Sequence, residues 1–145
     1  MKGRRARLAL ALSLAACTSP APPAKRVSLK TVGPASIQLV PAGGQLPYCL
    51  VFTRAESGIV RQLTPLDPNE AIPCPAGAPI GGATYRIPKA DGKIRIHVVL
   101  SDRAIDGRPV AAQVRELGAT PGFSAMDLRA PGNVLMETIE LAPAR

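Results

Sequence analysis

The chain has few of the side chains on which most catalytic and nucleic-acid-binding sites depend. Its 145 residues include no tryptophan and a single histidine, His97. The aromatic residues are Tyr48, Phe52, Tyr85 and Phe123. Single-stranded nucleic acid is commonly held by aromatic side chains on which bases stack, and general acid–base catalysis most often uses histidine. The composition therefore argues against nucleic acid as a partner and against an enzyme.

Short motifs that carry chemistry are also missing. No G-x-S-x-G segment offers a nucleophilic serine, and "GAPIGGAT" (77–84) lacks the Lys-Ser/Thr pair of a phosphate-binding loop. Two thiols and one distant histidine do not make a four-ligand metal shell. We therefore expect no catalytic residue, no metal and no cofactor. His97 is interpreted as an ordinary strand residue, because its spacing implies no partner residue.

The sequence lacks a hydrophobic run long enough to span a bilayer. The apolar run near the N-terminus covers Leu8 to Ala16 and contains one polar residue, Ser13, whereas a transmembrane helix needs about 20 apolar residues. Four basic residues precede the run and three prolines follow it closely. A basic segment, a short apolar segment and small residues at the end are typical of a secretory signal. Residues 1–16 are therefore predicted to be a signal peptide.

The end of this signal, Leu14-Ala15-Ala16-Cys17, resembles the lipobox of bacterial lipoproteins. The resemblance implies a diacylglyceryl thioether on Cys17, cleavage before Cys17, and acylation of the new N-terminus by a fatty acid such as palmitate. The alternative is an ordinary signal peptide with an incidental cysteine. Two or more acyl chains anchor a protein stably. In this family a residue other than Asp after the cysteine, here Thr18, favours the outer membrane, on its periplasmic face, in a double-membraned bacterium.

The formal charge of +8 does not mark a nucleic-acid-binding domain. Four of the basic residues lie in the signal peptide, and Lys25, Arg26 and Lys30 lie shortly after it, so residues 31–145 are nearly neutral. A nucleic-acid-binding domain needs a basic patch on its folded surface. The three cations after Cys17 would instead add about 1 kcal/mol each of attraction to anionic lipid.

The two remaining cysteines, Cys49 and Cys74, form an even pair in a chain predicted to be exported. Such a pair indicates a disulfide. It would close a loop of about 26 residues and stabilise the fold by roughly 3–4 kcal/mol. The alternative is two buried free thiols that behave as small hydrophobic residues.

Glycine and proline fall between apolar runs, as expected for turns between strands. Residues 17–34 are Pro-rich and are predicted to form a stalk, followed by one domain over 35–145. We expect a mainly β fold, a small antiparallel β-sandwich of about seven strands with one short helix. The expected strands are 36–40, 48–54, 59–64, 84–87 and 92–102, with a helix over 106–118 and a C-terminal hairpin around 130–133.

Residues 65–84 form the longest segment without a regular pattern, and they contain five prolines and three glycines. A loop restricted before binding loses less entropy when it docks. Its polar residues Asp67, Asn69 and Glu70 are therefore candidate partner-binding residues. The alternative is that the segment only connects the two sheets.

Three stretches, "LVFTRAESGIVRQLTP" (50–65), "YRIP" (85–88) and "IRIHVVLSD" (94–102), carry a second resemblance. With the helix that follows, they resemble an uncharacterised bacterial β-sandwich domain family found in envelope proteins and behind kinase-like or caspase-like modules. The resemblance covers residues 48–117. It implies a β-sandwich with a non-catalytic role and offers no functional residues to transfer.

These observations predict a membrane-anchored, non-catalytic envelope lipoprotein that acts as a protein-interaction or structural module, such as a subunit of an envelope machine. Its partners would be the membrane, through the lipid, and another envelope protein. The alternative is an enzyme or small-molecule-binding lipoprotein whose site is not visible in sequence patterns. A polar cluster around His97 in a concave site would favour that alternative.

Overall fold

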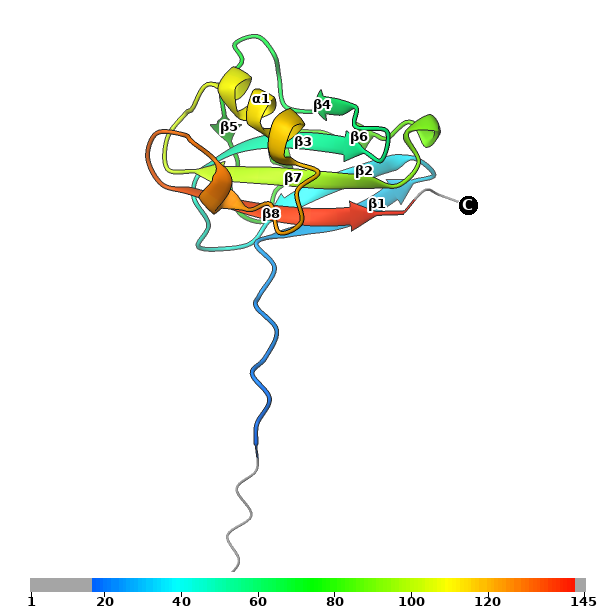
Figure 1. Ribbon diagram of the computed structural model, residues 1–145. Coiled ribbons are helices and arrows are strands. Elements are labelled where there is room, and N and C mark those ends of the chain that lie inside the picture. The colour runs from blue at the N-terminus through cyan, green and yellow to red at the C-terminus, as the bar shows by residue number, and fades with distance from the viewer. Residues whose placement is uncertain (1–16, 143–145) are drawn as a thin grey trace, which may run out of the picture.

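A computed structural model describes residues 17–142, so the predicted signal peptide (1–16) lies outside the described residues. Two antiparallel sheets pack against each other, and one helix covers the outer face of the larger sheet (Figure 1). The predicted fold class, a small mainly β sandwich with one short helix, is confirmed. The strands are β1 (Val27–Gly33), β2 (Ser36–Pro41), β3 (Tyr48–Ala55), β4 (Val60–Gln62), β5 (Ile72–Pro73), β6 (Tyr85–Arg86), β7 (Ile94–Ser101) and β8 (Val134–Leu141), and the helix is α1 (Gly107–Leu117).

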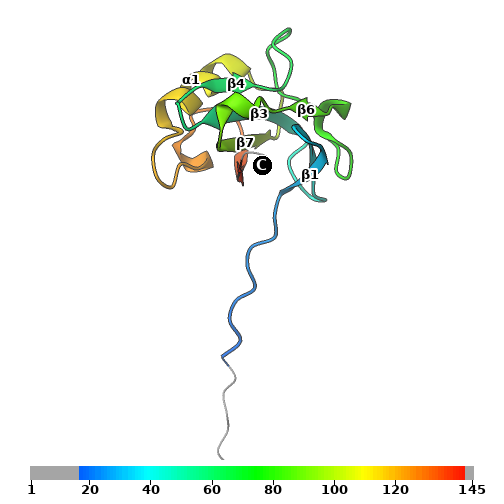
Figure 2. The same ribbon diagram turned by 90° about the vertical axis from the view of Figure 1, so that its right-hand side faces the viewer.

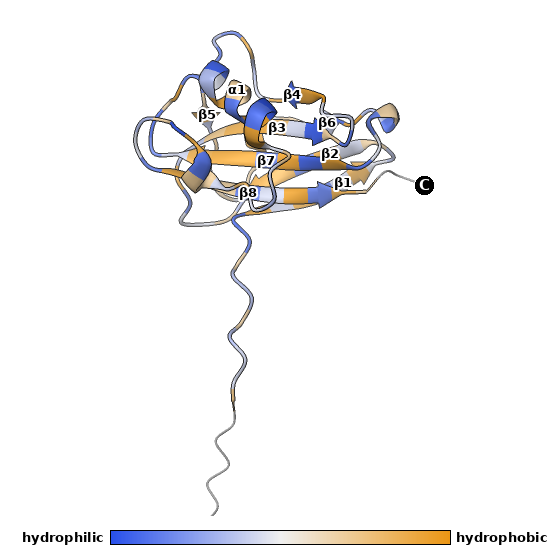
Figure 3. Cartoon of the chain, viewed as in Figure 1, coloured by the Kyte–Doolittle hydropathy of each residue, from blue (hydrophilic) through white to orange (hydrophobic). Residues whose placement is uncertain are grey.

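The larger sheet has the order β4-β3-β7-β8, with β5 also paired to β3, and the smaller sheet has the order β1-β2-β6. Strands β3 and β7 pair along their whole length, from Tyr48 opposite Ser101 to Ala55 opposite Ile94. Both strands are flanked on each side and covered on each face. This explains why β3 is nearly continuously apolar. Strand β7 is apolar over most of its length and has polar residues in its first half, as its hydropathy colouring shows (Figure 3).

Successive residues of β3 and β7 enter two different cores, because side chains alternate between the faces of a strand. Ile96 and Val98 lie in the core between the two sheets. Phe52 and Val99 lie in the core between the larger sheet and α1. The larger sheet is therefore the middle layer of three, with the smaller sheet on one face and α1 on the other.

The predicted helix is confirmed, and its ends follow from local chemistry. The side chain of Asp106 accepts a hydrogen bond from the backbone N–H of Arg108 at 2.9 Å and caps the helix. Pro109 lies in the first turn, where backbone N–H groups have no intrahelical partner. Val110 and Val114 are buried against the sheet. The helix ends before Gly118.

The predicted stalk boundary is too late. Strand β1 lies inside the range assigned to the stalk (17–34) and pairs with β2 from Val27 opposite Pro41 onward. Val27 is fully buried, and the Arg26 backbone N–H donates to the Glu137 carboxylate at 3.3 Å. A half-buried edge strand gives a weak alternating pattern, which the neighbouring prolines obscured. Only the segment before β1, residues 17–26, extends from the domain, and we call it the N-terminal arm (Figure 1).

The predicted C-terminal hairpin is wrong. Residues Ala125–Asp127 form a short 3-10 turn in which the side chains and backbones of Ser124 and Asp127 cap each other. Strand β8 pairs instead with β7 over eight residues. Pairing with β7 satisfies more backbone groups than a short local hairpin would, and this pairing is between segments that are distant in sequence. Within residues 17–142 no helix is long and apolar enough to cross a membrane.

Candidate functional site

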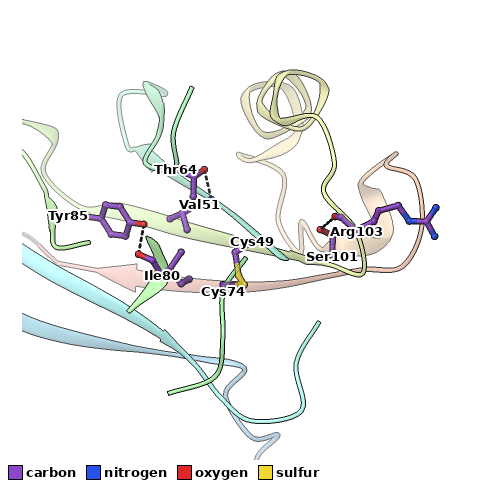
Figure 4. Close-up of a disulfide and its surroundings, with 8 residues drawn as sticks. All are labelled: Cys49, Val51, Thr64, Cys74, Ile80, Tyr85, Ser101 and Arg103. Carbon is purple, nitrogen blue, oxygen red and sulfur yellow. Dashed lines mark hydrogen bonds between the residues drawn. A yellow bond between two sulfur atoms is a disulfide. The ribbon is translucent and has the colours of Figure 1, made fainter. Parts of the chain in front are cut away.

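The predicted disulfide is confirmed and joins β3 to the segment 65–84. Cys49 and Cys74 are both buried, with their Cα atoms 5.9 Å apart (Figure 4). The backbone supports the same contact, because the Cys74 N–H donates to the Pro47 carbonyl at 2.9 Å. Strand β5 lies immediately before Cys74 and pairs with the start of β3. The bridge therefore fixes the middle of this segment to the larger sheet.

The second half of the segment 65–84 is also held in place. Ile80 is fully buried in the core between the sheets, and its carbonyl accepts a hydrogen bond from the Tyr85 hydroxyl at 3.0 Å (Figure 4). A 3-10 turn spans Ile80–Gly82. The segment is thus less irregular than the sequence indicated, and its long exposed stretch is confined to residues 65–70.

The three candidate partner-binding residues lie in this exposed stretch but differ in their contacts. The Asn69 side-chain oxygen accepts from Gln62 Nε2 at 2.8 Å, and the Asn69 carbonyl accepts from the Gly107 N–H at 2.9 Å. A Cβ at position 107 would collide with the Asn69 side chain. Glu70 forms an isolated β-bridge with Asp106 through its backbone. Asn69 therefore fastens the loop to the start of α1, while the carboxylates of Asp67 and Glu70 are exposed.

A groove of about 370 Å³ lies between β4, this loop and α1, and we call it the β4–α1 groove. Its lining residues are Val60, Arg61, Gln62, Leu66, Asn69, Arg108, Ala111 and Arg115. Three of them carry a positive charge and none carries a carboxylate. Only Asn69 among the predicted partner-binding residues contributes to the lining.

Sequence reasoning missed most of this lining. Arg108, Ala111 and Arg115 are spaced three and four residues apart, so a helix places them on one side. That spacing was a usable signal for a basic helix face. It gave no indication that β4 and Leu66 would lie opposite that face, because the contact between α1 and β4 is tertiary.

A second depression, of about 280 Å³, lies beside the turn between β3 and β4 and is lined by charges of both signs. Arg54, Glu56, Lys93 and Arg95 contribute to it. Lys93 and Arg95 both pair with the Glu140 carboxylate at 3.4 Å. Their charge is therefore already partly compensated within the domain.

A third pocket, of about 180 Å³, lies at the end of the sandwich where β1 turns into β2. Its lining includes Pro34, Ile37, Ile87 and Leu141. Small-molecule sites usually measure about 300–1,000 Å³, so this pocket is small for a ligand of ordinary size. It does not favour the alternative of a small-molecule-binding protein.

His97 lies inside the domain rather than in a pocket. It is 1% exposed, on the face of β7 that α1 covers. Its Nδ1 hydrogen-bonds the Thr138 hydroxyl at 3.0 Å, and the Phe123 ring packs edge-on with ring centres 5.4 Å apart. Nε2 has no hydrogen-bond partner among the described residues. None of the three pockets described above includes His97 in its lining, and a side chain this buried does not open onto a concave surface.

Burial lowers the pKa of His97 from 6.5 to about 4, with smaller contributions from Arg95 and Arg54. The unfolded chain therefore binds a proton more readily than the folded one between these values. The folded state therefore has its full stability with respect to His97 above pH 6.5, and it loses that stability as the pH falls towards 4. We expect the free energy of unfolding to fall by about 3 kcal/mol across this range, as measured by urea denaturation at each pH.

The matched control is His97→Gln, which keeps a hydrogen-bonding partner for Thr138 and has no charge to gain. Carboxylates also become protonated at low pH, so the informative quantity is the difference between the two proteins. If the free energy of unfolding depended on pH equally in the variant and the wild type between pH 6.5 and 4.5, the lowered pKa of His97 would be contradicted.

Comparisons with known proteins add no family to these observations. A scan of protein-family models, a search of curated proteins and a search of solved structures each give no match to this chain. The two resemblances stated above therefore stay predictions. In residues 17–142, no group of three or more His, Cys, Asp or Glu side chains is placed to hold a metal ion.

Proposed function

We propose that this protein is a lipid-anchored, non-catalytic envelope lipoprotein whose β-sandwich domain binds another envelope protein. The proposal is supported by the lipobox at Cys17, by the disulfide, which suits an oxidising compartment, and by the position of the N-terminal arm. Cys17 is exposed and forms no disulfide. Residues 17–25 are all exposed, so the arm could connect an acylated Cys17 to the folded domain.

The observation that carries the proposal is the direction in which the arm leaves the domain. In both ribbon views the arm extends from one side of the sandwich, while α1, β4 and the loop between β4 and β5 lie on the opposite side (Figures 1 and 2). Ten extended residues span at most about 35 Å. A membrane holding Cys17 would therefore leave the α1 side of the domain facing away from the bilayer, where a partner can reach it.

The cations near the arm fit the same orientation. Lys25 and Lys30 are exposed, and anionic headgroups would attract both. Arg26 pairs with Glu137 at 3.9 Å, which reduces its contribution. The three cations next to Cys17 would thus attract anionic lipid about as strongly as two unpaired cations would.

The proposal is tested by crosslinking in the cell. A photo-crosslinking side chain at Leu66, on the side opposite the arm, should capture one protein of the envelope reproducibly. The matched position is Thr31, exposed on β1 of the smaller sheet, where we expect no such product. Equal capture at both positions, or none at either, would contradict a partner on the α1 side.

The exposed carboxylates test the sequence-based prediction for the loop separately. Asp67→Ser with Glu70→Ser leaves Asn69 and its hydrogen bonds intact, so we expect an unchanged unfolding midpoint. If these carboxylates contact the partner, the crosslinked product from Leu66 should fall several-fold. An undiminished product would show that the loop acts through Leu66 and Asn69 or only connects β4 to β5.

A further inference from the structure

Strand β4 has an open edge that borders the β4–α1 groove. It is the end strand of the larger sheet, and no other strand described in residues 17–142 pairs with its outer side. The Ala55 N–H donates to the Ile59 carbonyl at 2.9 Å, and the Leu63 N–H donates to the Val51 carbonyl at 2.8 Å. These bonds flank the pairing of Arg61 with Thr53.

The positions of these bonds fix which backbone groups face outward. In an antiparallel ladder, alternate residues turn their N–H and C=O groups towards the partner strand. Residues 59, 61 and 63 face β3, so Val60 and Gln62 turn their backbone groups away from it. Both residues line the groove. The edge of β4 that borders the groove therefore offers two donors and two acceptors spaced as an added strand requires.

The charges that line the groove favour an acidic occupant, because three arginines and no carboxylate contribute to the lining. Arg61 is held by Asp91 through two hydrogen bonds of 3.0 and 3.2 Å. Arg108 lies 3.8 Å from Asp106, with both side chains exposed, an arrangement that contributes little. Arg115 forms no ion pair with any residue of the described chain. Two guanidinium groups on α1 are thus available to carboxylates in the groove.

The geometry also suits an extended segment with apolar residues between its acidic ones. Arg108 and Arg115 are seven residues apart, about 10 Å along the helix, which is close to the length of three strand residues. Leu66 and Ile59 are 66% and 49% exposed, and they flank β4 in the sequence. Alternate side chains of an added strand could contact these residues while the others reach the arginines.

We propose that the β4–α1 groove binds an extended acidic segment of a partner protein, which pairs with β4 as an additional strand. This deepens the proposed function, because it names the chemistry of the partner, but it does not depend on the lipid anchor. It also reassigns the recognition role of the loop from the carboxylates of Asp67 and Glu70 to Leu66 and Asn69.

Binding is measured by fluorescence anisotropy with the exported protein, purified with its natural N-terminus. The probe is a labelled eight-residue peptide of alternating valine and glutamate, and the control peptide has lysine in place of glutamate. We expect the glutamate peptide to bind with a dissociation constant below about 1 mM and the lysine peptide to bind at least about tenfold more weakly. Added salt should weaken the binding. No binding at 1 mM, or equal binding of the two peptides, would overturn the proposal.

Two variants separate charge from strand pairing. Arg108→Ser with Arg115→Ser should weaken binding of the glutamate peptide about tenfold or more, whereas Arg129→Ser, outside the groove lining, should leave it unchanged. Val60→Pro removes an N–H that points away from β3, which proline tolerates at a sheet edge, and should also weaken binding about tenfold. Val60→Thr changes the same side chain but keeps the N–H, so it should bind the glutamate peptide more tightly than Val60→Pro does. Wild-type binding by the proline variant would show that the charges attract the peptide without strand pairing.

Hydrogen exchange gives a result that does not depend on how well the proline variant folds. In the wild-type protein, the amides of Val60 and Gln62 should exchange at least about tenfold more slowly when the glutamate peptide is bound. Bound peptide without such protection would overturn the proposal. Loss of membrane attachment in a Cys17 variant would leave these results unaffected, so a failure of the anchor and a failure of the groove are distinguishable.

Discussion

Replacing both Cys49 and Cys74 with alanine should lower the free energy of unfolding by about 3–4 kcal/mol. The bridge closes a loop with a sequence separation of 25 residues, and removing it restores the conformational entropy of that loop in the unfolded chain. Both side chains are buried, so the variant also loses packing around the sulfur atoms. Urea denaturation monitored by circular dichroism measures the change.

The double variant provides its own control with a reducing agent. Dithiothreitol should lower the unfolding midpoint of the wild-type protein and leave that of the alanine variant unchanged. The segment 65–84 should become more accessible to proteases in both the reduced wild-type protein and the alanine variant, because Cys74 fixes the middle of this segment to β3. Native wild-type protein, purified without a reducing agent, in which both thiols react with an alkylating reagent would contradict the disulfide.

The second large effect concerns the N-terminus. We expect Cys17→Ser to remove membrane attachment and to leave the precursor uncleaved, because only the cysteine sulfur can form the thioether that the lipobox resemblance implies. Two or more acyl chains hold a protein firmly to a bilayer. The measurement is fractionation of membranes combined with the intact mass of the purified protein.

Thr18→Ser is the matched control, since it changes the neighbouring residue without removing the sulfur. It should be processed and attached as the wild type is. A Cys17→Ser protein with the same mature mass as the wild type would contradict lipidation. In that case the segment would be an ordinary signal peptide.

These predictions bear on different parts of the proposed function. The disulfide result concerns the stability of the domain, and the Cys17 result concerns its attachment. The crosslinking result concerns a partner on the α1 side, and the peptide result concerns the chemistry of that partner. A protein that is anchored but captures no partner would retain its predicted location and lose its proposed role.

Several features of this protein were determined by local sequence. The nearly continuous apolar residues of β3 predicted a strand covered on both faces, and the apolar residues that recur at every second position of β7 predicted a strand with one apolar face. Pro109 near the start of 106–118 and Gly118 at its end predicted a helix, since such start and stop signals act over a few residues, whereas the cap from Asp106 was seen only in the structure. The even pair Cys49 and Cys74 predicted a bridge without giving the geometry that permits it.

Other features were decided only by the tertiary structure. Strand β1 was assigned to a stalk, because only its pairing with β2 distinguishes its weak pattern from the Pro-rich segment before it. Strand β8 was assigned to a local hairpin, because a strand pattern does not identify the strand's partner. The β4–α1 groove combines three segments separated along the chain, the edge of β4, Leu66 and the Arg108 side of α1. Each has an ordinary sequence by itself. Hydrogen-bond pairing and packing between distant segments determine which surfaces meet. Local sequence periodicity carries no information about which distant segments pair or pack together.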